Sequence, residues 1–124
     1  MEVRERCNAI EECYEFMLAY AGKGLPGDES GSPLRDHLAR AIEALSGLAD
    51  AYAGAVNHEP RYRAFLALLD ADAARSRTAM ELVLSLPSIS SQVIDNLNAL
   101  IHLRALLTDL FLIDEILRRS SATR

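Results

Sequence analysis

The stretch from Ser88 to Arg119 constrains the fold most, because it is the longest helical pattern in the chain and the most apolar. In a helix that turns by about 100° per residue, its polar side chains share one narrow face, which we predict to be exposed. That face consists of Ser91, Asp95, Asn98, His102 and Asp109. Apolar residues fill the remaining arc of roughly 200°, twice what a surface helix needs. The stretch therefore predicts a long helix with several neighbours in its own chain, or one that a second chain covers.

Three further helical patterns precede this stretch. Apolar residues recur at helical spacing over residues 2–21, 33–56 and 60–86. Glycine and proline interrupt the pattern over residues 22–32, which predicts a flexible loop. The turn before Pro60 is short, which favours antiparallel neighbours.

The helix boundaries carry recognisable signals. Ser32 followed by Pro33 is typical of a helix start, because the hydroxyl can accept from an early N–H group and proline needs no partner there. Pro60 opens the third helix in the same way, and Ser88 is the expected cap of the last one.

Together the patterns predict an all-α fold of the up-down-up-down four-helix bundle type, since no strand pattern competes with them. A chain of 124 residues forms one ordinary domain, here spanning residues 1–124. The expected helices span about residues 2–21, 33–56, 60–86 and 88–119, and the expected frayed tail spans 120–124.

The charge balance restricts the partners. Eighteen acidic residues against thirteen basic ones give a net charge of −5, which disfavours nucleic acid and anionic membrane surfaces. The charged amino terminus does not resemble a signal peptide, and the longest uncharged run, 82–94, is too short to span a bilayer. Cys7 and Cys13 lie six residues apart on one helix and cannot reach each other for a disulfide. We therefore expect reduced, buried thiols and a cytoplasmic protein.

Motifs for catalysis and metal binding are incomplete. Glu11, Glu12 and Glu15 have the E-E-x-x-E form that begins some helical metal sites. No glutamate in the chain is followed three residues later by His or Asp, so the completing half of such a site is missing. The G-x-S-x-G nucleophile motif is also absent. We expect a protein that is not an enzyme and has no cofactor.

Several polar residues fall within or beside the apolar arcs of the predicted helices, where a buried charge needs a partner. These are Arg6, Asp70, Asp72, Asn96, Arg104 and Asp114. Antiparallel packing predicts that Arg104 meets Asp70 or Asp72, and that Asp114 meets Arg6. Such ion pairs would fix helix register. The alternatives are that these residues line a polar cavity for a small ligand, using the small residues of 71–79, or that they make contacts across a subunit interface.

The apolar arcs of the first and last helices exceed what one core requires, and monomers rarely expose large apolar patches. The residues left over as an interface are Phe16, Tyr20, Leu106, Ile113 and Ile116. Burial in a two-fold homodimer is the commonest solution. We therefore expect a self-associating interaction protein of the adaptor, chaperone-like or regulatory kind, with an unidentified protein partner as a further expectation.

A second reading comes from the run His37-Leu38-Ala39-Arg40-Ala41, which, with Gly47 ten residues after the histidine, resembles the H-x-L-K-G core of histidine phosphotransfer domains. Those domains are also acidic helical bundles of about this length. The resemblance implies that His37 accepts the phosphoryl group and that Arg40 supports it electrostatically. The chain departs from the motif where Ala39 replaces leucine and Ala41 replaces glycine.

Overall fold

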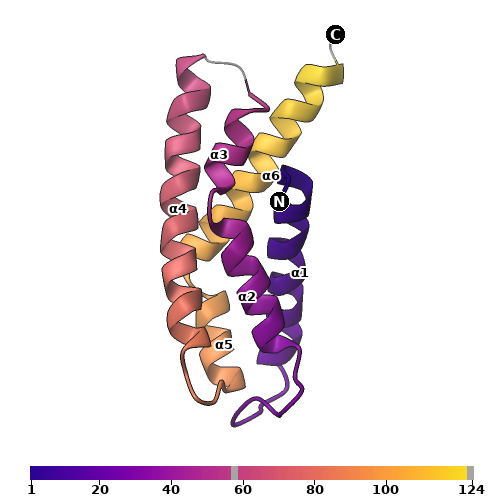
Figure 1. Cartoon of the computed structure of the whole chain (residues 1–124), viewed down its shortest axis with the longest axis vertical. Coiled ribbons are helices and arrows are strands. Elements are labelled where there is room, and N and C mark those ends of the chain that lie inside the picture. Colours follow the sequence, from indigo (N-terminus) through magenta and orange to yellow (C-terminus); the bar gives the residue numbers. More distant parts are fainter. Residues whose placement is uncertain (57–58, 123–124) are drawn as a thin grey trace.

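The structure is a computed structural model that describes residues 1–56 and 59–122. Within these ranges it contains six helices and no strand: α1 (Val3–Ala21), α2 (Leu34–Leu45), α3 (Leu48–Ala53), α4 (Pro60–Leu84), α5 (Ser91–Asn98) and α6 (Ile101–Ala122). Consecutive segments run along the long axis in alternating directions, with α1 down, α2 and α3 up, α4 down, and α5 and α6 up (Figure 1). The all-α class is confirmed, whereas the prediction of four continuous helices is wrong.

The predicted helix 33–56 is interrupted at Gly47, which separates α2 from α3. Gly47 has φ +80°, a left-handed conformation that residues with a Cβ atom rarely adopt. Arg6 of α1 satisfies carbonyl groups at the end of α2, because its Nη1 donates to the oxygen of Ala44 at 3.0 Å and to that of Ser46. Glycine at the break and arginine at the helix end therefore produce this interruption together.

The predicted helix 88–119 is also divided, into α5 and α6, and this break contains neither glycine nor proline. The two helices serve different neighbours, because α5 packs mainly on α1 and α6 mainly on α4. The buried face of α5 includes Ser91, Ile94 and Asn98. A continuous helix would extend that face to Ile101 and Leu112, yet both of these are exposed. The buried side of the chain therefore changes direction between α5 and α6.

This change of phase makes the predicted solvent-exposed face wrong. Only Asp95 is exposed, whereas Ser91 and Asn98 are buried and His102 and Asp109 are partly buried. The Ser91 hydroxyl connects α5 to the end of α1, since it donates to the Tyr20 carbonyl at 2.7 Å and accepts from the Leu25 N–H group at 2.9 Å.

The α1–α2 loop and the α4–α5 connection are joined at one end of the molecule, the lower end in Figure 1. Asp28 accepts from Arg35 at 2.7 Å and from the Ile89 N–H group at 2.7 Å. Arg35 also donates to the carbonyls of Leu84 at 3.0 Å and Leu86 at 2.8 Å. The hydrogen bonds from Arg35 and Ile89 lower the pKa of Asp28 to about 2. The predicted flexibility of loop 22–32 stays a prediction.

The helix ends agree with the sequence at some positions only. The prediction that Pro60 opens a helix is confirmed, but Ser90 rather than Ser88 caps α5, by accepting from the Val93 N–H group at 3.1 Å. α6 continues to Ala122, beyond the predicted end at residue 119. Residues 57–58 in the predicted short turn and 123–124 in the predicted tail lie outside the described residues. Within 1–56 and 59–122, no helix has the length and apolar character needed to cross a bilayer.

Candidate functional site

A groove runs between α1 and α6, each of which packs mainly on other helices. Its lower section has a volume of about 590 Å³. That section is lined by Glu11, Tyr14, Glu15, Leu18, Arg104, Leu107, Thr108 and Phe111. Its upper section, of about 650 Å³, is lined by Val3, Arg4, Cys7, Asn8, Glu11, Asp114, Leu117 and Arg118. Because both sections include Glu11, we treat them as one groove, the α1–α6 groove.

Exposed apolar side chains accompany this groove. Leu18 on its α1 edge is 49% exposed and Phe111 on its α6 edge is 59% exposed, while Leu107 is buried between them. α6 exposes two further apolar residues, Leu112 at 49% and Ile116 at 37%. A groove with an apolar floor and exposed apolar side chains among the charged residues of its edges is the type of surface that a partner helix occupies.

Most of the predicted interface residues lie elsewhere. Tyr20, Leu106 and Ile113 are buried in the chain's own core, so their prediction as an interface is corrected. Phe16 is partly buried and stacks on Tyr20, with ring centroids 6.4 Å apart. Ile116 is the one member of the predicted set that is exposed. The first and last helices do carry exposed apolar residues, but the helical wheel identified other side chains as the exposed ones.

Asp114 lies near the start of α1, as predicted, but its partner is Tyr52 and not Arg6. The Tyr52 hydroxyl donates to Asp114 Oδ1 at 2.6 Å and lies 3.2 Å from Cys7 Sγ. Burial and these contacts raise the pKa of Tyr52, and burial raises that of Cys13 to about 12. Both thiols are buried and free, and burial raises the pKa of each, which disfavours the reactive thiolate.

The predicted pairing of Arg104 with Asp70 or Asp72 is wrong. Arg104 is exposed on the edge of the α1–α6 groove, and Asp70 is exposed on α4. Asn96, predicted within the apolar arc, is exposed and accepts from Gln92 at 3.3 Å. The register that the prediction assigned to these residues assumed one continuous last helix.

Asp72 instead meets a second carboxyl group, that of Asp109 on α6. Asp72 is buried, and its Oδ1 lies 3.8 Å from Arg75 Nη1. Burial, the hydrogen bond to Asp72 and the negative charge of Asp72 raise the pKa of Asp109 to about 7. Asp109 Oδ2 is buried without a donor, as expected where two acceptors meet. A proton on Asp109 converts this contact into a hydrogen bond between α4 and α6.

Sequence reasoning missed this carboxyl pair because Asp109 was assigned to the solvent-exposed face. It also missed two buried polar side chains, Ser76 and Asn98, for which residues 1–56 and 59–122 provide no hydrogen-bond partner. A helical wheel restarted at Ile101 would have placed Asp109 toward α4, but the sequence contains no turn residue to prompt that restart.

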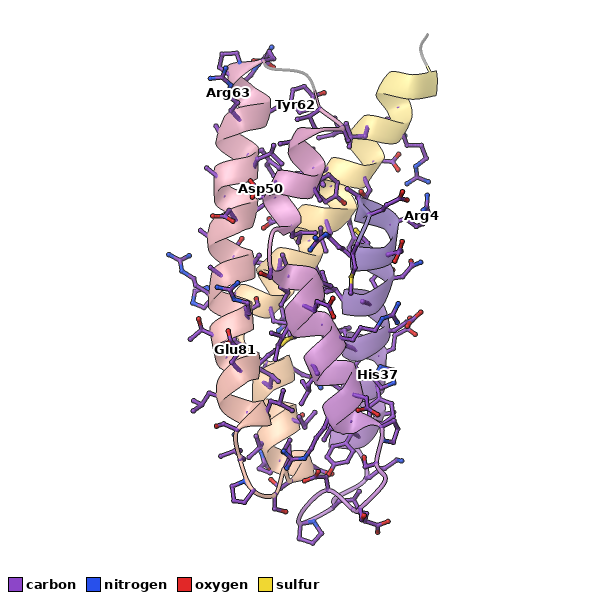
Figure 2. All side chains as sticks on the ribbon, viewed as in Figure 1. Arg4, His37, Asp50, Tyr62, Arg63 and Glu81 are labelled. Carbon is purple, nitrogen blue, oxygen red and sulfur yellow. The ribbon has the colours of Figure 1, made fainter. Side chains whose placement is uncertain are left out.

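The geometry around His37 differs from what a phosphoacceptor requires. His37 projects from α2 on the side toward α1 (Figure 2), and its ring stacks on that of Phe16 with centroids 4.7 Å apart. One face of the imidazole is therefore covered. Arg40, the expected electrostatic support, donates to Glu12 of α1 at 3.0 Å. No observation favours phosphotransfer over a packing role for His37.

The described ranges hold no group of three or more His, Cys, Asp or Glu residues that could bind a metal ion. Glu11 and Glu15 lie along the groove, and Glu12 pairs with Arg40. The small residues of α4 contribute Ala74 and Ala79 to a shallow hollow of about 430 Å³ beside His102. In the described part of the chain no side-chain hydrogen bond crosses this hollow, so it gives no support to the predicted ligand cavity.

Comparisons with protein-family models, curated proteins and solved structures found no significant match to this chain.

Proposed function

We propose that this chain is a non-enzymatic interaction protein that self-associates through the α1–α6 groove. In this proposal the fold is an up-down-up-down four-helix bundle in which two of the four helices are interrupted. One of them consists of α2 and α3, and the other of α5 and α6. The contact forms on the side where α1 and α6 leave the groove between them. We further propose that the protein acts in the cytoplasm as an adaptor, chaperone-like or regulatory component, since free cysteines are typical of reducing compartments.

The observation that carries this proposal is the exposure of Leu18 and Phe111 on opposite edges of a groove whose floor is also apolar. Removing a large apolar side chain from water contributes roughly 1.5 to 3 kcal/mol. A two-fold contact buries each such residue twice, so a few of them provide enough free energy for association at micromolar concentration.

The test is the molar mass in solution, with Leu18→Glu as the disrupting variant. We expect the unaltered chain to have twice its 13.6 kDa mass at micromolar concentration by light scattering. Glutamate at position 18 would bring a charge into the contact and raise the dissociation constant by roughly tenfold or more. Leu68→Glu is the matched control, because Leu68 is also 49% exposed but lies on α4, outside the groove.

A chain that remains monomeric at protein concentrations up to about 100 µM would contradict the proposal. Equal weakening by Leu68→Glu and Leu18→Glu would also contradict it, because the contact would then not be specific to the groove. Circular dichroism of both variants would establish that each remains helical.

A further inference from the structure

Charged residues of opposite sign border the lower section of the α1–α6 groove. Glu11 and Glu15 stand on the α1 edge, and Arg104 stands on the α6 edge. The described residues provide no ion pair for any of these three, whereas most of the other arginines in the same ranges have a carboxylate or carbonyl partner. The groove therefore offers an unpaired negative edge facing an unpaired positive edge.

The directions of the two helices fix the levels of these charges along the groove. α1 and α6 run in opposite directions (Figure 1), so Arg104, near the start of α6, lies at the Leu18 end of α1. Glu15 precedes Leu18 by three residues, which is about 4.5 Å along a helix axis. An arginine side chain spans that distance, so a copy of Arg104 placed against α1 at the same level would reach Glu15.

We propose that the occupant of the groove is a second copy of this chain, turned about a two-fold axis parallel to the groove, so that α1 of each copy lies against α6 of the other. This inference rests on the proposed function and specifies the partner and the pairing of helices. Such an axis preserves the level of each residue and exchanges the two edges. Each Glu15 then faces Arg104 of the other copy, and the pair occurs twice.

The alternative two-fold axis also lies in the contact plane but runs across the lower section of the groove. It would place α1 of one copy against α1 of the other. It would bring Glu11 and Glu15 against the same carboxylates of the second copy, and like charges in contact are unfavourable. It would also leave both copies of Arg104 without a carboxylate. The charges therefore favour the axis along the groove.

Charge reversal tests this pairing through the dimer dissociation constant, measured by sedimentation equilibrium at low salt. We expect Arg104→Glu and Glu15→Arg each to raise the constant by about tenfold, since each change replaces two attractive pairs with two repulsive ones. The double variant Glu15→Arg with Arg104→Glu restores both pairs and should return the constant to within about threefold of the original. Arg63→Glu, at the upper end of α4 (Figure 2), is the control that changes net charge equally away from the groove.

The outcomes separate this inference from the proposed function. A monomeric unaltered chain overturns both. A dimer that weakens with Leu18→Glu, but that Glu15→Arg strengthens or leaves unchanged, overturns the pairing of α1 with α6 and leaves the proposed function standing. Failure of the double variant to recover, while its helix content and melting temperature match those of the single variants, also overturns the pairing.

Discussion

At the scale of single residues, the contact between Asp72 and Asp109 brings two carboxyl groups together between α4 and α6. Two ionised carboxylates at this position would repel each other where water screens them poorly. Burial, the hydrogen bond to Asp72 and the negative charge of Asp72 raise the pKa of Asp109 to about 7, so protonation of Asp109 relieves this repulsion. The contact between α4 and α6 is therefore stronger in the protonated form.

The pH dependence of stability follows from the raised pKa of Asp109. Its unfolded value is 3.8 and its folded value is about 7, so the folded state holds the proton more tightly. The associated stability is fully present below pH 3.8 and is lost as the pH rises through about 7. Because Asp109 is only partly buried, we expect a loss on the order of 1 to 2 kcal/mol between pH 5.5 and 8, measured by urea unfolding.

Asp109→Asn should remove most of this slope, since the amide can donate to Asp72 at any pH. Asp70→Asn is the control, because Asp70 is exposed two residues before Asp72. A slope that is the same in Asp109→Asn as in the unaltered chain would show that other groups cause it.

At the scale of elements, the two interruptions have different origins and differ in how well the sequence indicates them. The α2–α3 break lies at a glycine, and its left-handed conformation is the reason that glycine is needed. The α5–α6 break lies at Ala99 and Leu100, which have no such requirement. Packing against α1 and then against α4 decides the second break, and a local pattern contains no information about those neighbours.

Substitution of the two glycines that flank α3 tests whether the left-handed backbone conformation explains the α2–α3 break. Gly47 has φ +80° and Gly54 has φ −74°. We expect Gly47→Ala to lower the free energy of unfolding by about 1 to 2 kcal/mol, because alanine in the left-handed region is strained. Gly54→Ala should leave stability unchanged or raise it by about 0.5 to 1 kcal/mol, because alanine fits a right-handed helical conformation. Equal effects at both positions in thermal or urea unfolding would argue against a conformational cause.

At the scale of the whole molecule, composition and periodicity were enough to predict the all-α class and the approximate extent of α1 and α4. They also indicated that the first and last helices have more apolar surface than one core uses. They did not identify which residues remain outside, because they assigned the outer surface of α6 to Leu106 and Ile113, which lie on the opposite side of the helix from the exposed Phe111 and Leu112. The Arg6, Tyr52 and Asp28 contacts join residues far apart in the chain, and a single sequence does not show such pairs.

The proposed association has a consequence for the stability of the whole molecule. A dimer that unfolds to monomers is stabilised by mass action, so its melting temperature rises with concentration. Between about 2 and 200 µM we expect a rise of roughly 3 to 6 °C, measured by calorimetry. In Leu18→Glu the rise should be smaller, because the raised dissociation constant leaves less dimer over the same range. A concentration-independent value in the unaltered chain would mean that folding and association are not coupled.

The contacts of Asp28 and Arg35 fasten the loops at one end of the molecule, and the Ser91 hydroxyl ties the end of α1 to α5 at the same end. At the other end of the molecule, the Tyr52 hydroxyl contacts both Cys7 of α1 and Asp114 of α6. Because the helices are held at both ends, α1 and α6 have little freedom to move apart. The groove between them is therefore ready to receive a partner without prior rearrangement.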